Sequence, residues 1–423
     1  MTILAGLIVG SIQLLVQCRT YRSELAIKYT PTVFPWLRLE EKTILEDKHW
    51  QWSAPSDESS GSFDREGFVE HRHEWQRLGR GFEGETFQYD GSVVKVFLTH
   101  NAPFRNCVPG TSPELRWPTE ISASLILGGQ NNDGREHINE DATFLPVTDY
   151  FLSPETDGQK ARWHFLTPFL PSGGLPRLAK RLREEDTAYT AQDLDVVFRS
   201  SLDRLLGGLD EMHTGHELCH DDVKLDNIFV DAPTAHGDET EAAPNPNETT
   251  HWLLGDLGNV REIEHPYHSS LLWLASGKNL ADCRANDVVR LLKVYMQFLR
   301  QSVSDKASFD RELFRGAEPW SALFWSVWAA PRGDGGTLSA TKALDMSQNV
   351  HHPLSQPDDS GLRGREVPEL DNTLYRLVLG ERRILSWATG HLLNVKMGEG
   401  KARWWALVPF LGMPYAPCQA ATS

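Results

Sequence analysis

The chain has 423 residues, with 42 Lys and Arg against 58 Asp and Glu and a formal net charge of −16 at pH 7. This acidic balance argues against a nucleic-acid partner, because phosphate backbones are bound through clustered positive charge. An apolar content of 40% permits a substantial core, and the five cysteines show no zinc or CxxC spacing, which favours a reducing compartment.

Residues 1–18 are almost entirely apolar and uncharged, and Arg19 and Arg22 follow them. A length of about 18 residues is the short end for a membrane span, and positive charge before the run, typical of a signal peptide, is missing. One hypothesis is therefore a membrane anchor with the rest of the chain facing the cytosol. The alternative is a buried or frayed apolar helix. Residues 19–70 follow as an acidic extension without an assigned role.

Residues 78–98 carry a glycine motif of the form G-x-G-x-x-G, built from Gly79, Gly81 and Gly84. The sequence after it predicts a strand over 86–89, a turn at Asp90-Gly91 and a second strand over 92–97. A hairpin at this place differs from the strand and helix that flank a dinucleotide-binding motif. Lys95 lies among valines in the second strand, where by itself it would be an ordinary solvated lysine.

A short helix is predicted over residues 117–127, with Pro118 near its start. Glu120 falls in its first turn, where an acidic side chain is also favoured simply by the helix dipole. Glu114 is an alternative partner for a buried cation, although Pro118 would interrupt a helix that carried it.

Residues 163–167 read as a buried strand, and residues 168–175 as a connector that contains Leu170. Apolar residues then recur at helical spacing over 192–212.

Residues 219–230 contain the densest group of reactive side chains, in the pattern H-x-D-x-K-x-x-N. The pattern is formed by His220, Asp222, Lys224 and Asn227, and an apolar strand over 228–230 follows directly. A carboxylate, a cation and a neutral oxygen ligand so close together fit phosphoryl transfer, which requires positioning and charge neutralisation.

Residues 231–251 are polar and rich in proline, and we expect a disordered insertion between two strands. The second strand, 252–254, leads to Asp256-Leu257-Gly258. Asp287 opens a later apolar helix, where by itself it would be an N-cap.

Residues 331–365 are rich in Gly, Ser, Asp and Pro, which predicts a loop or linker. Residues 366–423 regain helical periodicity and are predicted to form the last helices of the same domain.

Together, these motifs resemble the catalytic domain of the protein kinase superfamily over roughly residues 75–300, in the same chain order. The resemblance implies an α+β fold of two lobes: an N-lobe of antiparallel sheet plus one helix over 71–170, and a mainly helical C-lobe over 171–330. It also implies ATP and Mg²⁺ as cofactors, a protein substrate and a cytoplasmic setting.

The resemblance assigns a role to each candidate residue, and it implies that Asp287, as the alternative to an N-cap, is a buried group that bonds the loop around His220. Asp222 would be the catalytic base and Lys224 the cation beside the transferred phosphoryl, while Asn227 and Asp256 would bind the metal. ATP would be held by Lys95, paired with Glu120, by Leu170 in the connector between lobes, and by the glycine hairpin with Leu78, Gly79, Gly81, Gly84 and Thr86.

Lys224 favours Ser/Thr hydroxyls as acceptors over tyrosine. Two departures from the family are clear. Asp221 occupies the position of the usual arginine, and no A-P-E motif follows Asp256. The first departure suggests that activity is not switched on by phosphorylation of the segment after Asp256. Because the A-P-E motif is missing and that segment is altered, two alternatives stay open: a small-molecule kinase of the aminoglycoside-phosphotransferase type and a catalytically weak scaffold.

Overall fold

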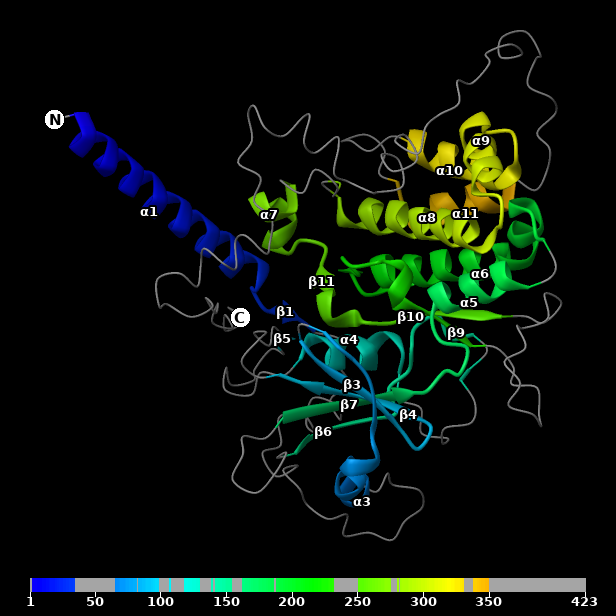
Figure 1. Cartoon of the computed structure of the whole chain (residues 1–423), viewed down its shortest axis with the longest axis horizontal. Coiled ribbons are helices and arrows are strands. Elements are labelled where there is room, and N and C mark those ends of the chain that lie inside the picture. Colours follow the sequence, from blue (N-terminus) through cyan, green and yellow to red (C-terminus); the bar gives the residue numbers. More distant parts are fainter. Residues whose placement is uncertain are drawn as a thin grey trace.

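The computed structural model shows a mixed α+β architecture in which a five-stranded antiparallel sheet lies beside a group of helices (Figure 1). The structure describes residues 2–34, 65–81, 83–98, 106–107, 118–129, 138–139, 141–153, 162–185, 188–231, 250–274, 280, 282–330 and 338–349.

The sheet has the strand order β2-β3-β4-β7-β6, with every neighbouring pair antiparallel. Its strands are β2 (Gln76–Arg80), β3 (Gly84–Tyr89), β4 (Ser92–Phe97), β6 (Asp149–Ser153) and β7 (Arg162–Pro168). The predicted hairpin is confirmed, because β3 and β4 pair along their full length and turn at Asp90-Gly91.

Alternation along β4 sends neighbouring side chains to opposite faces of the sheet. Val94 and Val96 are buried in a small apolar cluster with Phe68 and Trp75. Lys95 therefore points to the other face, toward α4 (Thr119–Leu127).

The helices beside the sheet share one apolar core. They are α5 (Leu175–Glu184), α6 (Ala191–Asp210), α8 (Cys283–Ser302), α9 (Lys306–Arg315), α10 (Pro319–Ala329) and α11 (Ala340–Asn349). The helix predicted over 192–212 is α6, whose first turn is closed by reciprocal hydrogen bonds between Thr190 and Asp193. The turn Glu211–Gly215 continues it toward the loop around His220.

Among the described residues, three short strand pairs lie outside the five-stranded sheet. The predicted strands after Asn227 and before Asp256 form an antiparallel pair, β9 (Ile228–Asp231) with β10 (His251–Leu254). The pair β8 (Leu218–Cys219) and β11 (Arg261–Glu262) flanks the same region. β1 (Thr32–Val33) and β5 (Asn106–Cys107) pair in parallel.

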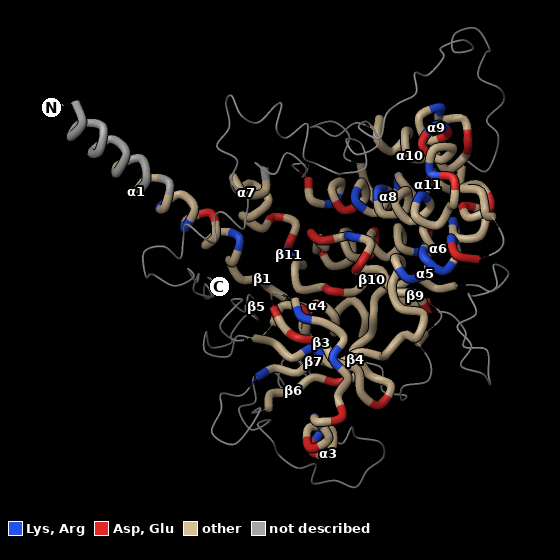
Figure 2. The backbone as a smooth tube through the Cα atoms, viewed as in Figure 1, with Lys and Arg blue, Asp and Glu red and all other residues tan. Residues whose placement is uncertain are grey.

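The N-terminal helix α1 (Thr2–Lys28) projects from the body at its N-terminal end (Figure 1). Figure 2 shows its charged residues gathered at the opposite end, near β1 and β11. Within the residues described, none of the helices combines the length and apolarity needed to span a bilayer.

Residues 24–34, called the N-terminal strap below, pack against the chain after Asp256. Thr32 Oγ1 donates to the Val260 carbonyl at 3.1 Å, and Glu24 accepts from the Leu271 amide at 2.7 Å. The Val33 amide donates to Glu262, and Phe34 is fully buried in the main core. Part of the expected extension over 19–70 is therefore integral to the fold.

The prediction of a loop or linker over residues 331–365 is wrong in part, because α11 lies within this range. Ser339 Oγ accepts from the Lys342 amide at the start of this helix, and Ala340 and Ala343 are buried in the main core. The helix was missed because its small residues lie between a glycine-rich stretch and a proline-rich stretch, whose composition is typical of a loop. The predicted helices of 366–423 and the predicted insertion between β9 and β10 lie outside the described residues, except for residues 231, 250 and 251 at its ends.

Candidate active site

Lys95 is the centre of a buried charge cluster between the sheet and α4. Its ammonium lies 2.5 Å from Glu120 Oε2 and 3.4 Å from Asp256 Oδ1. The lysine and glutamate side chains are 17% and 7% exposed. The pairing of Lys95 with Glu120 expected from sequence is thus present, whereas Glu114 lies outside the described residues.

The glycine hairpin is closed at its tip by the Gly81 amide, which donates to the Gly84 carbonyl at 2.8 Å. At its base, Thr86 Oγ1 donates to the Gly79 carbonyl at 3.4 Å. A Cβ added to Gly84 would lie 2.5 Å from the Val96 carbonyl oxygen, so the close approach of β3 to β4 requires glycine here. The motif is therefore part of a hairpin, β2 and β3, that lies next to the Lys95 strand in the same sheet.

Leu78 and Leu170 differ in their surroundings. The Leu78 residue is 48% exposed in β2, while Leu170 is 8% exposed just after β7. The Leu170 carbonyl accepts from the Gly173 amide at 2.9 Å, which forms a tight turn before α5.

The loop of residues 220–227 brings Asp222 to the same cluster. Lys224 Nζ lies 2.7 Å from Asp222 Oδ2 and 3.6 Å from Asp256 Oδ2. Asn259 Nδ2 also donates to Asp222 Oδ2 at 3.4 Å. A continuous series of charged contacts thus runs from Glu120 through Lys95, Asp256 and Lys224 to Asp222.

Asn227 lies beside Asp256 because β9 and β10 pair directly after and before them. The Gly255 amide donates to the Asn227 carbonyl at 2.9 Å, and Asn227 Nδ2 donates to the Asp222 carbonyl at 3.0 Å. Because the amide nitrogen is engaged, the Asn227 side-chain oxygen is the atom left to act as a ligand. An amide oxygen with the Asp256 carboxylate is a donor set that suits Mg²⁺.

Asp287 anchors this loop from α8. Its carboxylate accepts from the His220 amide at 2.7 Å and from the Asp221 amide at 3.1 Å. Asp282, not Asp287, caps the helix. Of the two alternatives for Asp287, the structure selects the buried group that bonds the loop.

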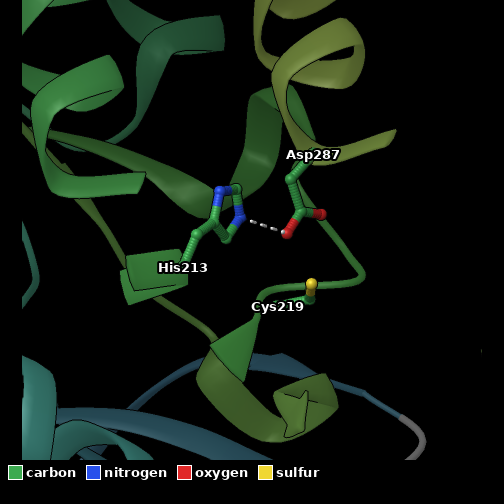
Figure 3. A group of neighbouring side chains, drawn as sticks. All are labelled: His213, Cys219 and Asp287. Atoms are coloured by element: carbon green, nitrogen blue, oxygen red, sulfur yellow. Dashed lines mark hydrogen bonds and ion pairs between the residues drawn. The ribbon is translucent and has the colours of Figure 1, made fainter. Parts of the chain in front are cut away.

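His213, Cys219 and Asp287 lie together behind the loop, with His213 Nε2 3.3 Å from Asp287 Oδ2 (Figure 3). The Cys219 sulfur is bonded to Cys283 in a disulfide, and both Asp287 oxygens accept loop amides. This group is therefore an anchor for the loop and not a metal centre. The spacing of the cysteines gave no sign of this disulfide, which is at odds with the reducing compartment expected from that spacing.

The charge cluster shifts the pKa values of its members. The nearby Lys95 lowers the pKa of Asp256 to about 2 despite burial, and Lys224 acts in the same direction. Burial would lower the pKa of Lys95, but Glu120, Asp256 and Glu83 outweigh it and raise the pKa. Burial would also lower the pKa of Lys224, and its hydrogen bond to Asp222 and nearby carboxylates raise it instead. Asp256, Lys95 and Lys224 are thus charged at neutral pH, whereas burial raises the pKa of Glu120 to about 7 against the opposing effect of Lys95.

Two members of the site were missed by the sequence reasoning. Asn259 directly follows Asp256-Leu257-Gly258, and its side chain donates to Asp222. Its position next to that motif is the one feature of the sequence that could have indicated a role in the site. Glu83 lies at the hairpin tip, and its Oε2 would be only 2.9 Å from a Cβ on Gly258. Nothing in the glycine motif predicted an acidic side chain at that place.

Comparison of the chain with protein-family models finds no matching model, and comparison with curated proteins finds no matching relative.

Proposed function

We propose that the chain is an ATP-dependent phosphotransferase with a two-lobed, protein-kinase-like fold, and that it acts on Ser/Thr hydroxyls of a protein substrate. The observation that carries the proposal is the series of contacts from Glu120 through Lys95, Asp256 and Lys224 to Asp222. Residues from four separate stretches of sequence converge there. A largely buried cation held between carboxylates is costly to keep in place, and such perturbed charges are concentrated at functional sites.

The groups have distinct tasks in this proposal. Lys95, oriented by Glu120, binds the α- and β-phosphates. Asp222 orients the acceptor hydroxyl and takes its proton. Lys224 lies 2.7 Å from Asp222 and offsets negative charge that develops on the transferred phosphoryl.

Mg²⁺, when bound, would neutralise charge on the β- and γ-phosphates, and Asn227 and Asp256 would hold it. The glycine hairpin, with Leu78, Gly79, Gly81, Gly84 and Thr86, would cover the phosphates. Leu170 would meet the adenine in the connector between sheet and helices. A cytoplasmic setting and an anchor in residues 1–18 remain predictions that accompany this function.

Phosphoryl transfer from labelled ATP tests the proposal. Purified full-length chain is incubated with Mg²⁺, γ-labelled ATP and generic protein acceptors, alongside Asp222→Asn. Because the variant lacks the proton acceptor, we expect transfer to fall on the order of 10²- to 10⁴-fold. Asp345→Asn is the matched control, since Asp345 is exposed in α11, and it should retain activity. Equal transfer by wild type and Asp222→Asn would refute the assignment of the base.

A small-molecule acceptor is the second candidate function. It is favoured by the strap, which packs over residues 260–272 on the chain that follows Asp256. Transfer to an aminocyclitol-type alcohol, without transfer to protein, would select this candidate. The third alternative, a weakly catalytic scaffold, is disfavoured by the complete set of charged residues.

A further inference from the structure

We propose that Asp221 is a positioning residue whose carboxylate, held by Arg261 and His268, fixes the loop that carries Asp222. The catalytic side of this inference rests on the proposed phosphoryl transfer.

Every polar group of Asp221 is bound, and the partners come from three elements. Its amide donates to Asp287, and its carbonyl accepts from Arg290 at 2.6 Å, both from α8. Arg261 of β11 donates to the carboxylate at 2.8 Å. His268, in the turn Pro266–Ser269, lies 3.0 Å from the same carboxylate oxygen. Asp221 is therefore a junction between α8 and the chain that follows Asp256.

The backbone of Asp221 needs these contacts. Its φ is +64°, a left-handed conformation that non-glycine residues adopt at a cost. Such a conformation persists only where the surroundings hold it in place. Asp222 is the next residue, so relaxation of this turn would displace the proposed base.

The pair of Asp221 and Arg261 is nearly sealed from solvent. Their side chains are 2% and 1% exposed. Without Arg261, this buried carboxylate would keep only His268 as a side-chain partner, and a buried charge that loses one of its partners is costly. The orientation of the loop thus depends on Arg261 more strongly than one hydrogen bond would suggest.

The N-terminal strap contacts Arg261 and the turn that carries His268. The Arg261 guanidinium donates to the Lys28 carbonyl at 3.4 Å, and its Cζ lies 4.4 Å from the ring centre of Tyr267. His265 Nε2 lies 3.0 Å from the Thr30 carbonyl. Arg261 is consequently held on both sides and presents a fixed partner to Asp221.

The test compares two buried Arg–Asp pairs in the full-length chain. Arg261→Met breaks the pair at the loop, and Arg199→Met breaks the equally buried pair with Asp195 within α6. Hydrogen exchange of peptides covering 219–227 and steady-state phosphoryl transfer are measured for both variants. Arg261→Lys, which keeps the charge, tests rescue.

For Arg261→Met, we expect faster exchange over 219–227 and a fall in kcat on the order of 10²-fold, because the base is misplaced. The KM for ATP should change little, since Lys95 is untouched. Arg261→Lys should recover part of both effects. Arg199→Met should change neither readout, even if it lowers the melting temperature.

Unchanged exchange over 219–227 in folded Arg261→Met would overturn the inference. Equal effects of Arg199→Met would also overturn it, because they would reflect general destabilisation. If wild type transfers no phosphate, the proposed function fails, and the exchange result still decides whether Asp221 positions the loop. If Arg261→Met does not fold, the isosteric Asp221→Asn is measured with the same two readouts.

Discussion

Glu83 places a third carboxylate near Lys95, beside Glu120 and Asp256. Its charge contributes to the raised pKa of Lys95 and to the raised pKa of Glu120. In the proposed site, the phosphates of ATP would approach the same ammonium. Glu83 would then repel the nucleotide unless the hairpin tip moved away.

We predict that Glu83→Gln binds Mg·ATP more tightly, by roughly fivefold, because removal of one repulsive charge contributes ~1 kcal/mol. Equilibrium titration of the nucleotide measures the effect. Glu85→Gln is the matched control, since Glu85 in the adjoining strand pairs with Arg77 and not with Lys95. Weaker or unchanged binding by Glu83→Gln would contradict the proposed place of the phosphates.

At the scale of elements, the junction around Asp221 gives a dependence on pH. Burial acts to raise the pKa of Asp221, but His268 and Arg261 outweigh it and lower the pKa to about 2. Burial would lower the pKa of His268, and Asp221 raises it instead. Arg261 opposes that rise, and His268 in turn acts to lower the pKa of Glu262.

The stabilisation from His268 is complete below its unfolded pKa of about 6.5 and is lost as pH rises through the higher folded value. The stabilisation from Asp221 is complete above its unfolded pKa of about 3.9 and is lost as pH falls toward its folded value of about 2. Both contributions are therefore present between about pH 4 and about pH 6.5.

We predict that the free energy of unfolding falls between about pH 5.5 and about pH 8.5, and that His268→Gln removes part of this fall. Denaturant titration at the two pH values measures it. His73→Gln is the control, because that side chain is 76% exposed. An equal fall in wild type and His268→Gln would show that the contact with Asp221 does not carry the effect.

The strap gives a prediction on the integrity of the N-terminal region. Phe34 is fully buried in the main core, whereas Leu15 of α1 is 62% exposed. Phe34→Ala should lower the free energy of unfolding by about 3–5 kcal/mol, through lost burial and the cavity left behind. Leu15→Ala should stay within about 0.5 kcal/mol of wild type. Equal, small effects of both would mean that the strap is dispensable.

The local spacing of apolar and turn residues was sufficient to predict several helices and strands. Alternating valines and an Asp-Gly turn predicted β3 and β4, helical spacing predicted α6, and two short apolar runs predicted β9 and β10. The motif residues Lys95, Glu120, Asp222, Lys224 and Asp256 were named from sequence, and the structure brings their side chains together.

Contacts between distant segments could not be predicted in the same way. Thr32 and Val260 are 228 residues apart, and Cys219 and Cys283 are 64 apart, with no spacing rule that links them. Glu83 and Asn259 depend on how two loops meet, and α11 depends on the core against which its small residues pack. Each of these contacts depends on tertiary packing, which local patterns in a single sequence do not show.

Across the whole molecule, the proposed function requires that sheet and helices together form a site for Mg·ATP. Calorimetric titration of the full-length chain with ATP, with and without Mg²⁺, measures whether this site exists. We expect one binding site per chain that depends on Mg²⁺, is lost in Lys95→Met and is retained in Lys180→Met, where an exposed lysine of α5 is changed. Absence of binding in wild type, or equal binding by Lys95→Met, would contradict it.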